Sequence, residues 1–457
     1  MAAAHKSSGK TSVSVGLAAA LAKRGLSVQP FKKGPDYIDP LWLARAAGTA
    51  CYNLDFFTMS HAEILSTFAR RAATADISLI EGNKGLFDGL DVEGTDSNAA
   101  LAKMLSAPVI LVIDATGMTR GVAALVRGYL DFDEEVDIRG VILNKVGGAR
   151  HEGKLRAALE RYTDTEVLGA IGRDQALEIP ERHLGLVPAN EADRADATIG
   201  RIADAMSAGV NIDRLIEIAD SSEMPLTEMV STTASAKPTA DVRIAIARDA
   251  AFGFYYQDDL EAFAANGAEL IPFDTLNDPK LPEADGLFIG GGFPETHMAE
   301  LSANQSLRAE IRQALASGMP AYAECGGLMY LSRSIQWRDE KYDMVGAVPG
   351  DIIVDARPQG RGYVLIEETG KCSWPPASHG PSDPSAGIPA HEFHYARLGN
   401  LSDGLDFAYR VIRGNGIDGH HDGLLVDNLL ASFAHRRNTE ADPWVNRWVE
   451  FVREKSV

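Results

Sequence analysis

A cysteine in the second half of the chain has the surroundings of a catalytic nucleophile. Residues 319–324 predict a short strand, Cys325 follows it, and Gly326 and Gly327 open a predicted helix. A sharp strand-to-helix turn exposes a nucleophile, and glycines make the turn possible. The helix N-terminus would lower the pKa of the thiol and favour the nucleophilic thiolate. A buried structural cysteine is the competing interpretation, but the strand–Cys–Gly–Gly–helix pattern favours catalysis.

Other motifs could supply the remaining parts of a thiol active site. The N–H group of Gly326 would be one donor to a developing oxyanion, and Gly291 and Gly292, which follow a predicted strand, could supply others. A thiol nucleophile also needs a base, and His435 follows an apolar run near the C-terminus. The sequence predicts Cys325 and His435 as the catalytic pair without showing that they approach within the ~3 Å that proton transfer needs.

The first residues of the chain fit a phosphate-binding loop. Residues 4–11 read Ala-His-Lys-Ser-Ser-Gly-Lys-Thr, a P-loop pattern in which alanine replaces the first glycine. Loop N–H groups would face phosphate oxygens, Lys10 would bridge the β- and γ-phosphates, and the Thr11 hydroxyl would bind Mg²⁺. An ordinary glycine turn is the alternative. Only residues 1–4 precede the loop, so the strand expected before a P-loop is either truncated or supplied differently. The predicted ATP-binding residues are Ser8, Gly9, Lys10, Thr11 and Asn144.

Carboxylates and lysines follow predicted strands of the same region. Glu81 ends a strand before a glycine-rich segment, where a second Mg²⁺ ligand belongs in an open α/β sheet. Segment 31–40 holds two lysines and two aspartates, which could bind substrate carboxylates, phosphate or Mg²⁺, although a solvated turn fits equally well. Asn144 could read an adenine edge or cap its loop. The predicted Mg²⁺ ligands are Thr11, Asp36 and Glu81, and the predicted substrate-binding residues are Lys33, Tyr37, Asp39 and Asp88.

The elements that must position these residues alternate between strands and helices. Apolar, β-branched runs predict strands at 26–31, 77–81, 108–114, 140–146 and 166–170, with helical segments between them. The alternation resumes with strands at 242–247, 269–273, 286–289 and 319–323. This pattern predicts an α/β fold with mainly parallel sheets. It divides into domains at 1–220 and 241–457, joined by a linker at 221–240 that is rich in small polar residues.

Composition narrows the classes of protein to consider. The chain has 457 residues, 45% of them apolar and 24% charged, as in a globular protein of two or three domains. The net charge of −20 disfavours a nucleic-acid partner, which needs clustered Lys and Arg. Three widely spaced cysteines give neither a disulfide framework nor zinc spacing, and indicate a reducing cytoplasm. No apolar run approaches the ~18 residues of a membrane span. The two histidines within residues 391–395 lack zinc-site spacing.

Read in order, the motifs match a known family. The chain resembles, nearly end to end, the cobyrinate a,c-diamide synthases, glutamine-dependent amidases of tetrapyrrole biosynthesis. The motifs that carry the resemblance are long and distinctive. They are Ser-Gly-Lys-Thr at 8–11, Lys-Gly-Pro-Asp-Tyr-Ile-Asp at 33–39, Glu-Gly at 81–82 with Gly-Leu-Phe-Asp-Gly at 85–89, Gly-Gly-Gly-Phe-Pro-Glu at 290–295, Glu-Cys-Gly-Gly at 324–327 and His-Glu-Phe-His-Tyr at 391–395.

The resemblance implies a specific enzyme. The first domain would be a dethiobiotin-synthetase-type P-loop domain that binds ATP, Mg²⁺ and a tetrapyrrole polycarboxylate, and the second a class I glutamine amidotransferase. Cys325 would attack the glutamine amide, His435 would raise its nucleophilicity, and ammonia would pass to the first domain. There ATP would phosphorylate the a and c acetate groups in turn for attack by ammonia. A homodimer is left open, and neither a nucleic acid nor a membrane is expected as a partner.

Several positions depart from the family pattern. Class I amidotransferases often place an acid two residues after the histidine, but position 437 is arginine, so we expect a Cys–His dyad or a third partner from elsewhere. Residues 5–6 and 83–84 are closer to relatives that amidate siroheme, and other relatives amidate nickel-sirohydrochlorin. A protein that binds ATP and a tetrapyrrole without catalysis is a further alternative, although intact Lys10 and Cys325 disfavour it.

Overall fold

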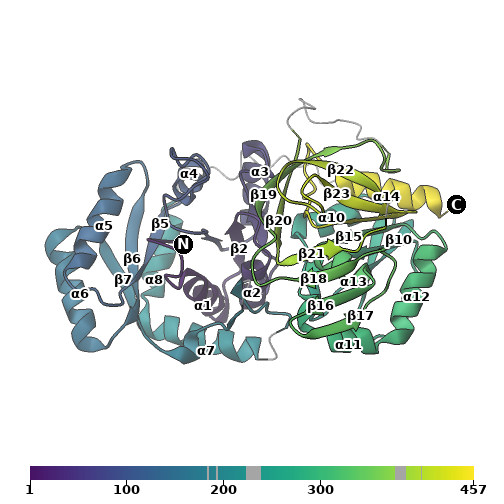
Figure 1. Cartoon of the computed structure of the whole chain (residues 1–457). Helices are drawn as coiled ribbons and strands as arrows, with labels where there is room; N and C mark the ends of the chain where they lie inside the picture. Colours follow the sequence, from purple (N-terminus) through teal and green to yellow (C-terminus); the bar gives the residue numbers. More distant parts are fainter. Residues whose placement is uncertain (183–184, 192–193, 223–237, 376–386, 403, 457) are drawn as a thin grey trace. The chain divides into compact units, whose positions relative to one another are not determined.

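The computed structural model of the chain divides into two compact units, Met1–Thr233 and Ala234–Val457. It describes residues 1–182, 185–191, 194–222, 238–375, 387–402 and 404–456. Most of the predicted linker at 221–240 therefore lies outside the described residues. Each unit is described by itself below, with the element labels of Figure 1.

The first unit is built on parallel strands with helices between them, as the alternation predicted. One sheet has the order β3-β2-β4 and the other β1-β5-β6-β7, and all their pairings are parallel. The strands are β1 (Ala2–Ala3), β2 (Val28–Lys33), β3 (Tyr52–Leu54), β4 (Ile77–Glu81), β5 (Val109–Asp114), β6 (Ile138–Val146) and β7 (Glu166–Gly172), followed by the short hairpin of β8 (Glu181–Arg182) and β9 (Gly185–Leu186).

Helices cover both faces of β5–β7 (Figure 1). Alternate residues of β5 belong to different cores: Ile110 and Val112 pack with α1, α7 and α8, whereas Leu111 and Ile113 pack with α5 and α6. Burial on both faces explains why the parallel strands read as continuous apolar runs. The helices are α1 (Lys10–Lys23), α2 (Ile38–Ala47), α3 (His61–Ala72), α4 (Asn98–Met104), α5 (Gly121–Phe132), α6 (Ala149–Tyr162), α7 (Ala195–Gly209) and α8 (Ile212–Asp220).

The strand that precedes the P-loop is present, although it is only two residues long. Ala2 and Ala3 of β1 pair in parallel with Leu111 and Val112 of β5. On its other side the chain meets β4, because the amine of Met1 donates to the carbonyl of Ile80 (2.7 Å) and the N–H of Gly82 donates to the carbonyl of Met1 (2.9 Å). Hydrogen bonds to neighbours on both sides hold this short segment as a strand. A strand of this length is too short for a sequence pattern to reveal.

The second unit contains a mixed sheet and a smaller one. The large sheet has the order β12-β10-β13-β15-β24-β23-β22-β19-β20, parallel from β12 to β24 and antiparallel beyond, and the smaller sheet has the order β17-β16-β18-β21. The strands of the large sheet are β10 (Val242–Ala247), β12 (Ala268–Phe273), β13 (Gly286–Ile289), β15 (Ala321–Glu324), β19 (Gly360–Glu368), β20 (Ile388–His394), β22 (Asp406–Arg413), β23 (His421–Val426) and β24 (Leu429–Ser432).

Two cores lie on the two faces of this large sheet. Ala321 and Ala323 of β15 pack in one core, and Tyr322 packs in the other against Trp444 and Trp448 of α14. The other α-helices and strands in the described part of this unit are α10 (Gln257–Ala265), α11 (Met298–Ala303), α12 (Gln305–Ala316), α13 (Gly326–Leu331), α14 (Trp444–Lys455), β11 (Phe252–Phe254), β14 (Gly291–Gly292), β16 (Ser334–Trp337), β17 (Glu340–Asp343), β18 (Asp351–Val354) and β21 (Ala396–Gly399). This packing fixes β15 and places the end of that strand, with Cys325, at the carboxyl edge of the parallel part.

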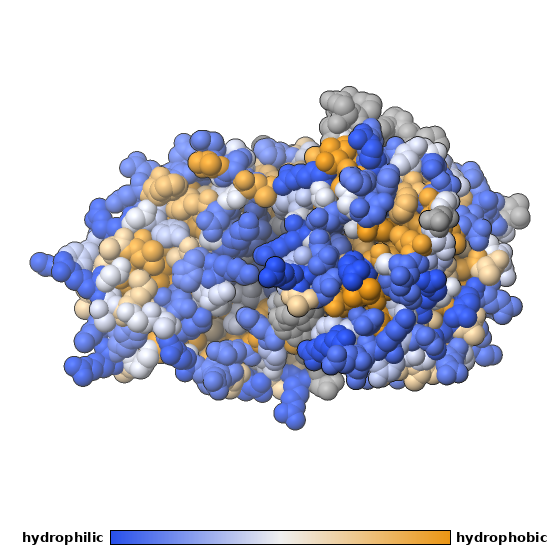
Figure 2. Space-filling model, viewed as in Figure 1, coloured by the Kyte–Doolittle hydropathy of each residue, from blue (hydrophilic) through white to orange (hydrophobic). Residues whose placement is uncertain are grey.

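Apolar residues on the drawn face occur as patches separated by hydrophilic side chains (Figure 2). Within the described part of the chain, none of the helices combines the length and apolar character needed to cross a membrane. The three cysteines, Cys51, Cys325 and Cys372, all carry free thiols.

Candidate active sites

Cys325 occupies a strained turn between β15 and α13. Its backbone has φ 47° and ψ −99°, a conformation that a non-glycine residue adopts only when its surroundings enforce it. The N–H of Cys325 donates to the carbonyl of Ser432 (2.7 Å), and the parallel pairing of Glu324 with Ser432 fixes the residue before it. The predicted nucleophile turn is therefore present, and two neighbouring strands hold it in place.

Glycines allow the parts of this site to approach one another. A Cβ atom at Gly327 would stand 2.1 Å from the carbonyl oxygen of Ile289, and one at Gly326 would stand 2.9 Å from the backbone nitrogen of Gly292. A Cβ at Gly291 would meet Cε1 of His435 at 2.6 Å. The structure thus brings the glycines predicted to bind an oxyanion together with the predicted base.

We expected the helix N-terminus to lower the pKa of the Cys325 thiol, but the pKa is raised. Burial, with only 6% of the residue exposed, raises the pKa of Cys325, and the nearby charge of Glu295 acts in the same direction. A hydrogen bond from the N–H of Gly326 lowers this pKa but does not offset burial. Because the pKa is raised, the thiol is protonated before substrate enters, and a base is needed to form the thiolate.

The imidazole of His435 faces a carboxylate that the sequence interpretation missed. Its Nδ1 lies 3.2 Å from Oε2 of Glu324, and both side chains are buried. The histidine is also held by paired backbone hydrogen bonds with His391, whose ring stacks on it with centroids 4.9 Å apart. The signal for Glu324 was its place beside the nucleophile, but nothing in the local pattern indicated that it turns toward a histidine 111 residues away.

The segment with two histidines at 391–395 is held by contacts within the second unit. The Glu392 carboxylate accepts the backbone N–H groups of Asn415 (2.8 Å) and Gly416 (3.0 Å). The ring of His394 stacks on Phe433 with centroids 4.0 Å apart, and its Nδ1 contacts the carbonyl of Ala396. Among the described residues, no group of three or more His, Cys, Asp or Glu side chains is placed to hold a metal ion.

The P-loop in the first unit is bent and braced as a phosphate-binding loop. Ser7 and Gly9 have φ values of 67° and 82°, and α1 begins at Lys10. Residues from the end of β6 support the loop: Nδ2 of Asn144 donates to the carbonyl of Ser8 (2.9 Å), and Nζ of Lys145 donates to that of Ser7 (3.0 Å). Asn144 thus braces the loop, and the prediction that it reads adenine stays a prediction.

Acidic and basic side chains meet at the first turn of α1. The Thr11 hydroxyl donates to Oε1 of Glu81 (2.7 Å) and lies 3.4 Å from Oδ2 of Asp39. Nζ of Lys32 contacts both carboxylates, at 2.5 Å from Asp39 and 3.1 Å from Glu81. Burial lowers the pKa of Lys32, but the two carboxylates outweigh burial and raise it above its usual value. Lys32, which the sequence interpretation did not single out, is therefore a buried ammonium between two carboxylates.

Asp39 rather than Asp36 lies beside Thr11 and Glu81. Oδ1 of Asp36 instead accepts the N–H groups of Ile38 (2.8 Å) and Asp39 (3.0 Å), which caps the start of α2. Burial and the nearby charge of Asp39 raise the pKa of Asp36 to about 6. Asp39 therefore takes the place beside Thr11 and Glu81 that the sequence interpretation gave to Asp36, because Oδ1 of Asp36 is engaged by the first turn of α2.

The other predicted substrate residues have surroundings of their own. Lys33 is buried and its Nζ lies 3.7 Å from Asp96. Asp88 accepts the N–H of Gly85 (2.9 Å), and Tyr37 is buried just before α2. Burial lowers the pKa of Lys33 and of Lys10, and the charge of Lys32 lowers the pKa of Lys10 further. An anion that bound beside either lysine would contact a poorly hydrated ammonium group.

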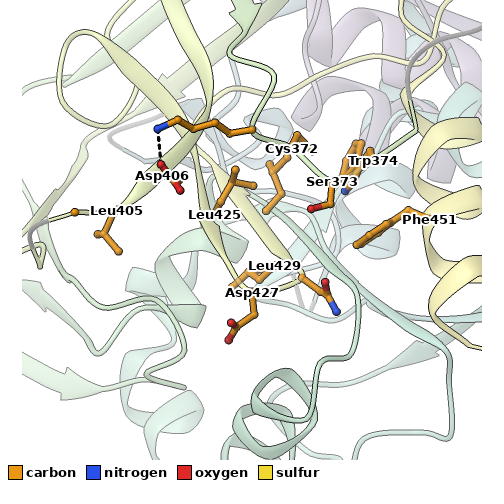
Figure 3. Close-up of a pocket in the computed structure, with 13 residues that line it drawn as sticks. Cys372, Ser373, Trp374, Leu405, Asp406, Leu425, Asp427, Leu429 and Phe451 are labelled. Atoms are coloured by element: carbon orange, nitrogen blue, oxygen red, sulfur yellow. Dashed lines mark hydrogen bonds and ion pairs between the residues drawn. The ribbon is translucent and has the colours of Figure 1, made fainter.

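A pocket of about 260 Å³ in the second unit is formed by other residues (Figure 3). It is lined by residues 371–374 and 404–406, Leu425, residues 427–430 and Phe451, and Lys371 pairs with Asp406. None of the predicted site residues lines it.

Comparison with known proteins identifies the two domains of the chain. Residues 1–187 match the model of the CobQ/CobB/MinD/ParA nucleotide binding domain, and residues 243–442 match the model of the CobB/CobQ-like glutamine amidotransferase domain. A protein of Magnetococcus marinus named cobyrinate a,c-diamide synthase is 47% identical, over 99% of this chain and 96% of its own length. The chain belongs to the cobyrinate a,c-diamide synthase family. Its first unit is a nucleotide-binding domain, and the chain is a glutamine-dependent, amide-forming ligase.

More distant members of the cobyrinate a,c-diamide synthase family are also matched along nearly their whole length. The protein of Methanosarcina acetivorans is 41% identical over 94% of this chain and 90% of its own. That of Archaeoglobus fulgidus is 41% identical over 98% of this chain and 93% of its own. Both carry the same name, so the family resemblance predicted from the motifs is confirmed.

Proposed function

We propose that this protein uses ATP and glutamine to amidate the a and c acetate carboxylates of cobyrinate. Residues 1–220 form the ATP-binding amidoligase domain and residues 241–457 the glutaminase domain. The observation that carries the choice of acceptor is the 47% identity, over nearly the full length of both chains, to a relative named for this substrate.

Release of ammonia is the task of the second unit. The Cys325 thiol transfers its proton to His435 as its sulfur attacks the side-chain amide carbon of glutamine. The N–H groups of Gly326, Gly291 and Gly292 stabilise the oxyanion that develops in the tetrahedral intermediate, a role supported by the close approach of Gly326 to Gly292 and of Gly291 to His435. Its collapse expels ammonia and leaves a glutamyl thioester, which water hydrolyses to glutamate.

Activation of the carboxylate is the task of the first unit. A carboxylate is a poor electrophile, and its attack on the γ-phosphorus of ATP releases ADP and gives an acyl phosphate with a good leaving group. Lys10 and the loop N–H groups neutralise the phosphates, and the buried Lys32 adds a second ammonium beside them. Ammonia then displaces phosphate to form the amide.

A Mg²⁺ ion fits the cluster at the start of α1. The Thr11 hydroxyl and the Asp39 and Glu81 carboxylates converge there, and Oε2 of Glu81 is buried with no hydrogen-bond partner among the described residues. A few oxygen ligands of this kind, completed by phosphates and water, are how Mg²⁺ is usually bound. When bound, the ion would offset negative charge on the transferred phosphoryl group.

The acceptor is tested by mass spectrometry of the amidated product. The protein is incubated with ATP, Mg²⁺ and glutamine, with cobyrinic acid, siroheme or nickel-sirohydrochlorin in separate reactions. In the cobyrinic acid reaction alone we expect two successive small decreases in mass, each from the replacement of a carboxyl hydroxyl by an amino group. If product forms with siroheme or nickel-sirohydrochlorin instead, that compound is the acceptor and the proposed mechanism is unchanged. If the protein neither hydrolyses glutamine nor makes product, the result supports the alternative of a protein that binds ATP and a tetrapyrrole without catalysis.

A further inference from the structure

We propose that Glu324 is the third member of the glutaminase site, a positioning residue that orients His435 from the position immediately before the nucleophile. This inference rests on the proposed glutaminase reaction of Cys325. It identifies the acid that this chain uses, since the position two residues after the histidine holds no acid.

The contacts of Glu324 fix both of its carboxylate oxygens. Oε2 faces Nδ1 of His435 at 3.2 Å, while Oε1 accepts the Tyr322 hydroxyl (2.6 Å) and the backbone N–H of Arg436 (3.1 Å). The residue is 3% exposed, so these protein groups rather than water solvate the carboxylate. Fixed oxygens in a buried site are what a residue needs to hold a neighbouring imidazole in one orientation.

The residue at position 437 is committed to another task. The Arg437 guanidinium is buried, pairs with Asp258 at 2.5 Å and lies 4.9 Å from the ring centre of Tyr256. An acid at this position would leave Asp258 without its cation. The chain therefore supplies the carboxylate from β15, where the parallel pairing with β24 brings residue 324 level with Ser432, three positions before His435.

The chemical role of Glu324 follows from the two nitrogens of the imidazole. A hydrogen bond from Nδ1–H to the carboxylate selects the tautomer in which Nε2 carries the lone pair, so proton exchange with the thiol uses Nε2. The proton of Cys325 moves to Nε2 as the sulfur–carbon bond forms, and from there to the departing nitrogen as the carbon–nitrogen bond breaks. Glu324 takes no proton itself; it stabilises the imidazolium that forms between these steps.

Glu324→Gln tests this role with little change of shape. The amide can present an N–H to Nδ1 and so favour the wrong tautomer. We expect kcat for glutamine hydrolysis to fall by roughly 10²–10⁴-fold, with KM for glutamine changed by less than about threefold. Amidation driven by added ammonium chloride should stay within about twofold of wild type, because the first unit is untouched. Glu324→Asp, which keeps the charge, should recover part of the lost kcat.

Glu392→Gln is the matched control. Glu392 is equally buried and accepts backbone N–H groups in the same unit, but its bonds go to the turn at Asn415 and Gly416. The Glu392→Gln substitution should lower the thermal unfolding midpoint at least as much as Glu324→Gln does, but the protein should keep most of its kcat for glutamine hydrolysis. A second control, Tyr322→Phe, removes a bond to Oε1 and keeps the carboxylate.

Two outcomes would overturn the inference. One is a Glu324→Gln protein whose kcat for glutamine lies within about threefold of wild type. The other is an equal loss of kcat in Glu392→Gln and Glu324→Gln, because a structural role alone would then explain it. Failure of the proposed function has a different signature: wild-type protein would release no glutamate, or Cys325→Ala would release as much as wild type.

Discussion

At the scale of single residues, the first unit holds a cluster of buried charges around Lys32. Lys32 is 2% exposed and contacts Asp39 and Glu81, of which Glu81 is fully buried. Burial raises the pKa of Asp39, but the Lys32 ammonium, assisted by Lys10 and Thr11, outweighs burial and holds that pKa below its usual value. Each charge in this cluster is tolerated only because the others are present.

Replacing Lys32 tests this mutual dependence. Lys32→Met would leave two buried carboxylates without their cation, and breaking a buried ion pair in this way costs about 3–5 kcal/mol. We expect the denaturant midpoint of the first unit to fall accordingly in urea unfolding. Lys23→Met is the control, because Lys23 pairs with Asp204 at the surface, and such pairs contribute at most about 1 kcal/mol. Similar losses in the two variants would contradict the argument.

The raised pKa of Asp36 predicts that the stability of the folded chain depends on pH. Its pKa is raised from 3.8 to about 6, so the folded chain holds this proton more tightly than the unfolded chain. The stabilisation is complete below the unfolded value and is lost as pH rises through about 6. Asp36→Asn keeps an oxygen for the N–H groups of Ile38 and Asp39 and cannot ionise. Urea unfolding of both proteins at about pH 4 and about pH 7 should show the variant gaining stability relative to wild type at the higher pH. A constant difference would refute this.

At the scale of elements, the packing of glycines positions the nucleophile. The turn between β15 and α13 presses against the end of β13, and the space for a side chain at Gly327 is filled by the Ile289 carbonyl. Because this neighbour is backbone, it cannot move aside as a flexible side chain would. The glycine pair after Cys325 is therefore a packing requirement of the fold as well as a feature of the chemistry.

Gly327→Ala should damage both stability and glutaminase activity. The Cβ atom would meet the Ile289 oxygen at 2.1 Å, so the turn must shift, and we expect a loss of about 2 kcal/mol or more. Gly399→Ala is the control in the same unit, because a Cβ there meets nothing nearer than 3.8 Å. Thermal unfolding and glutamate release measure the two effects. Gly327→Ala protein with wild-type values in both would show that the turn is looser than the structure has it.

At the scale of the whole molecule, the two reactions are assigned to different units. The residues proposed for the glutaminase site lie between residues 291 and 435, and those proposed for the phosphate site lie at or before residue 144. Each site is built within its own unit, from strands of its own sheets. The two half-reactions should therefore be separable by point mutation.

Reciprocal variants test this division of labour. Cys325→Ala should abolish amidation with glutamine and keep it with added ammonium chloride. Lys10→Ala should reduce amidation with either nitrogen source by roughly 10²-fold or more, because phosphoryl transfer loses a charge that stabilises it, and should still hydrolyse glutamine. Product and glutamate are measured in the same samples. Ammonium-driven amidation that also disappears in Cys325→Ala would refute the division.

The sequence by itself determined the class of fold and the family, and it predicted where both sites lie. Strands such as β4 and β5, the turn at Cys325 and the P-loop are all encoded by neighbouring residues, through apolar periodicity, glycine placement and short motifs. Local patterns of this kind are readable because backbone conformation depends mainly on adjacent residues. The identity of the family followed from the order of these motifs.

Only the tertiary structure decided which side chains meet. It turned Glu324 toward His435, placed Asp39 instead of Asp36 beside Thr11, buried Lys32 between two carboxylates and made a strand of Ala2 and Ala3. Each of these depends on residues far apart in the sequence, 111 positions for Glu324 and His435 and 70 for Thr11 and Glu81. Such contacts are set by strand order and register, which local patterns do not specify.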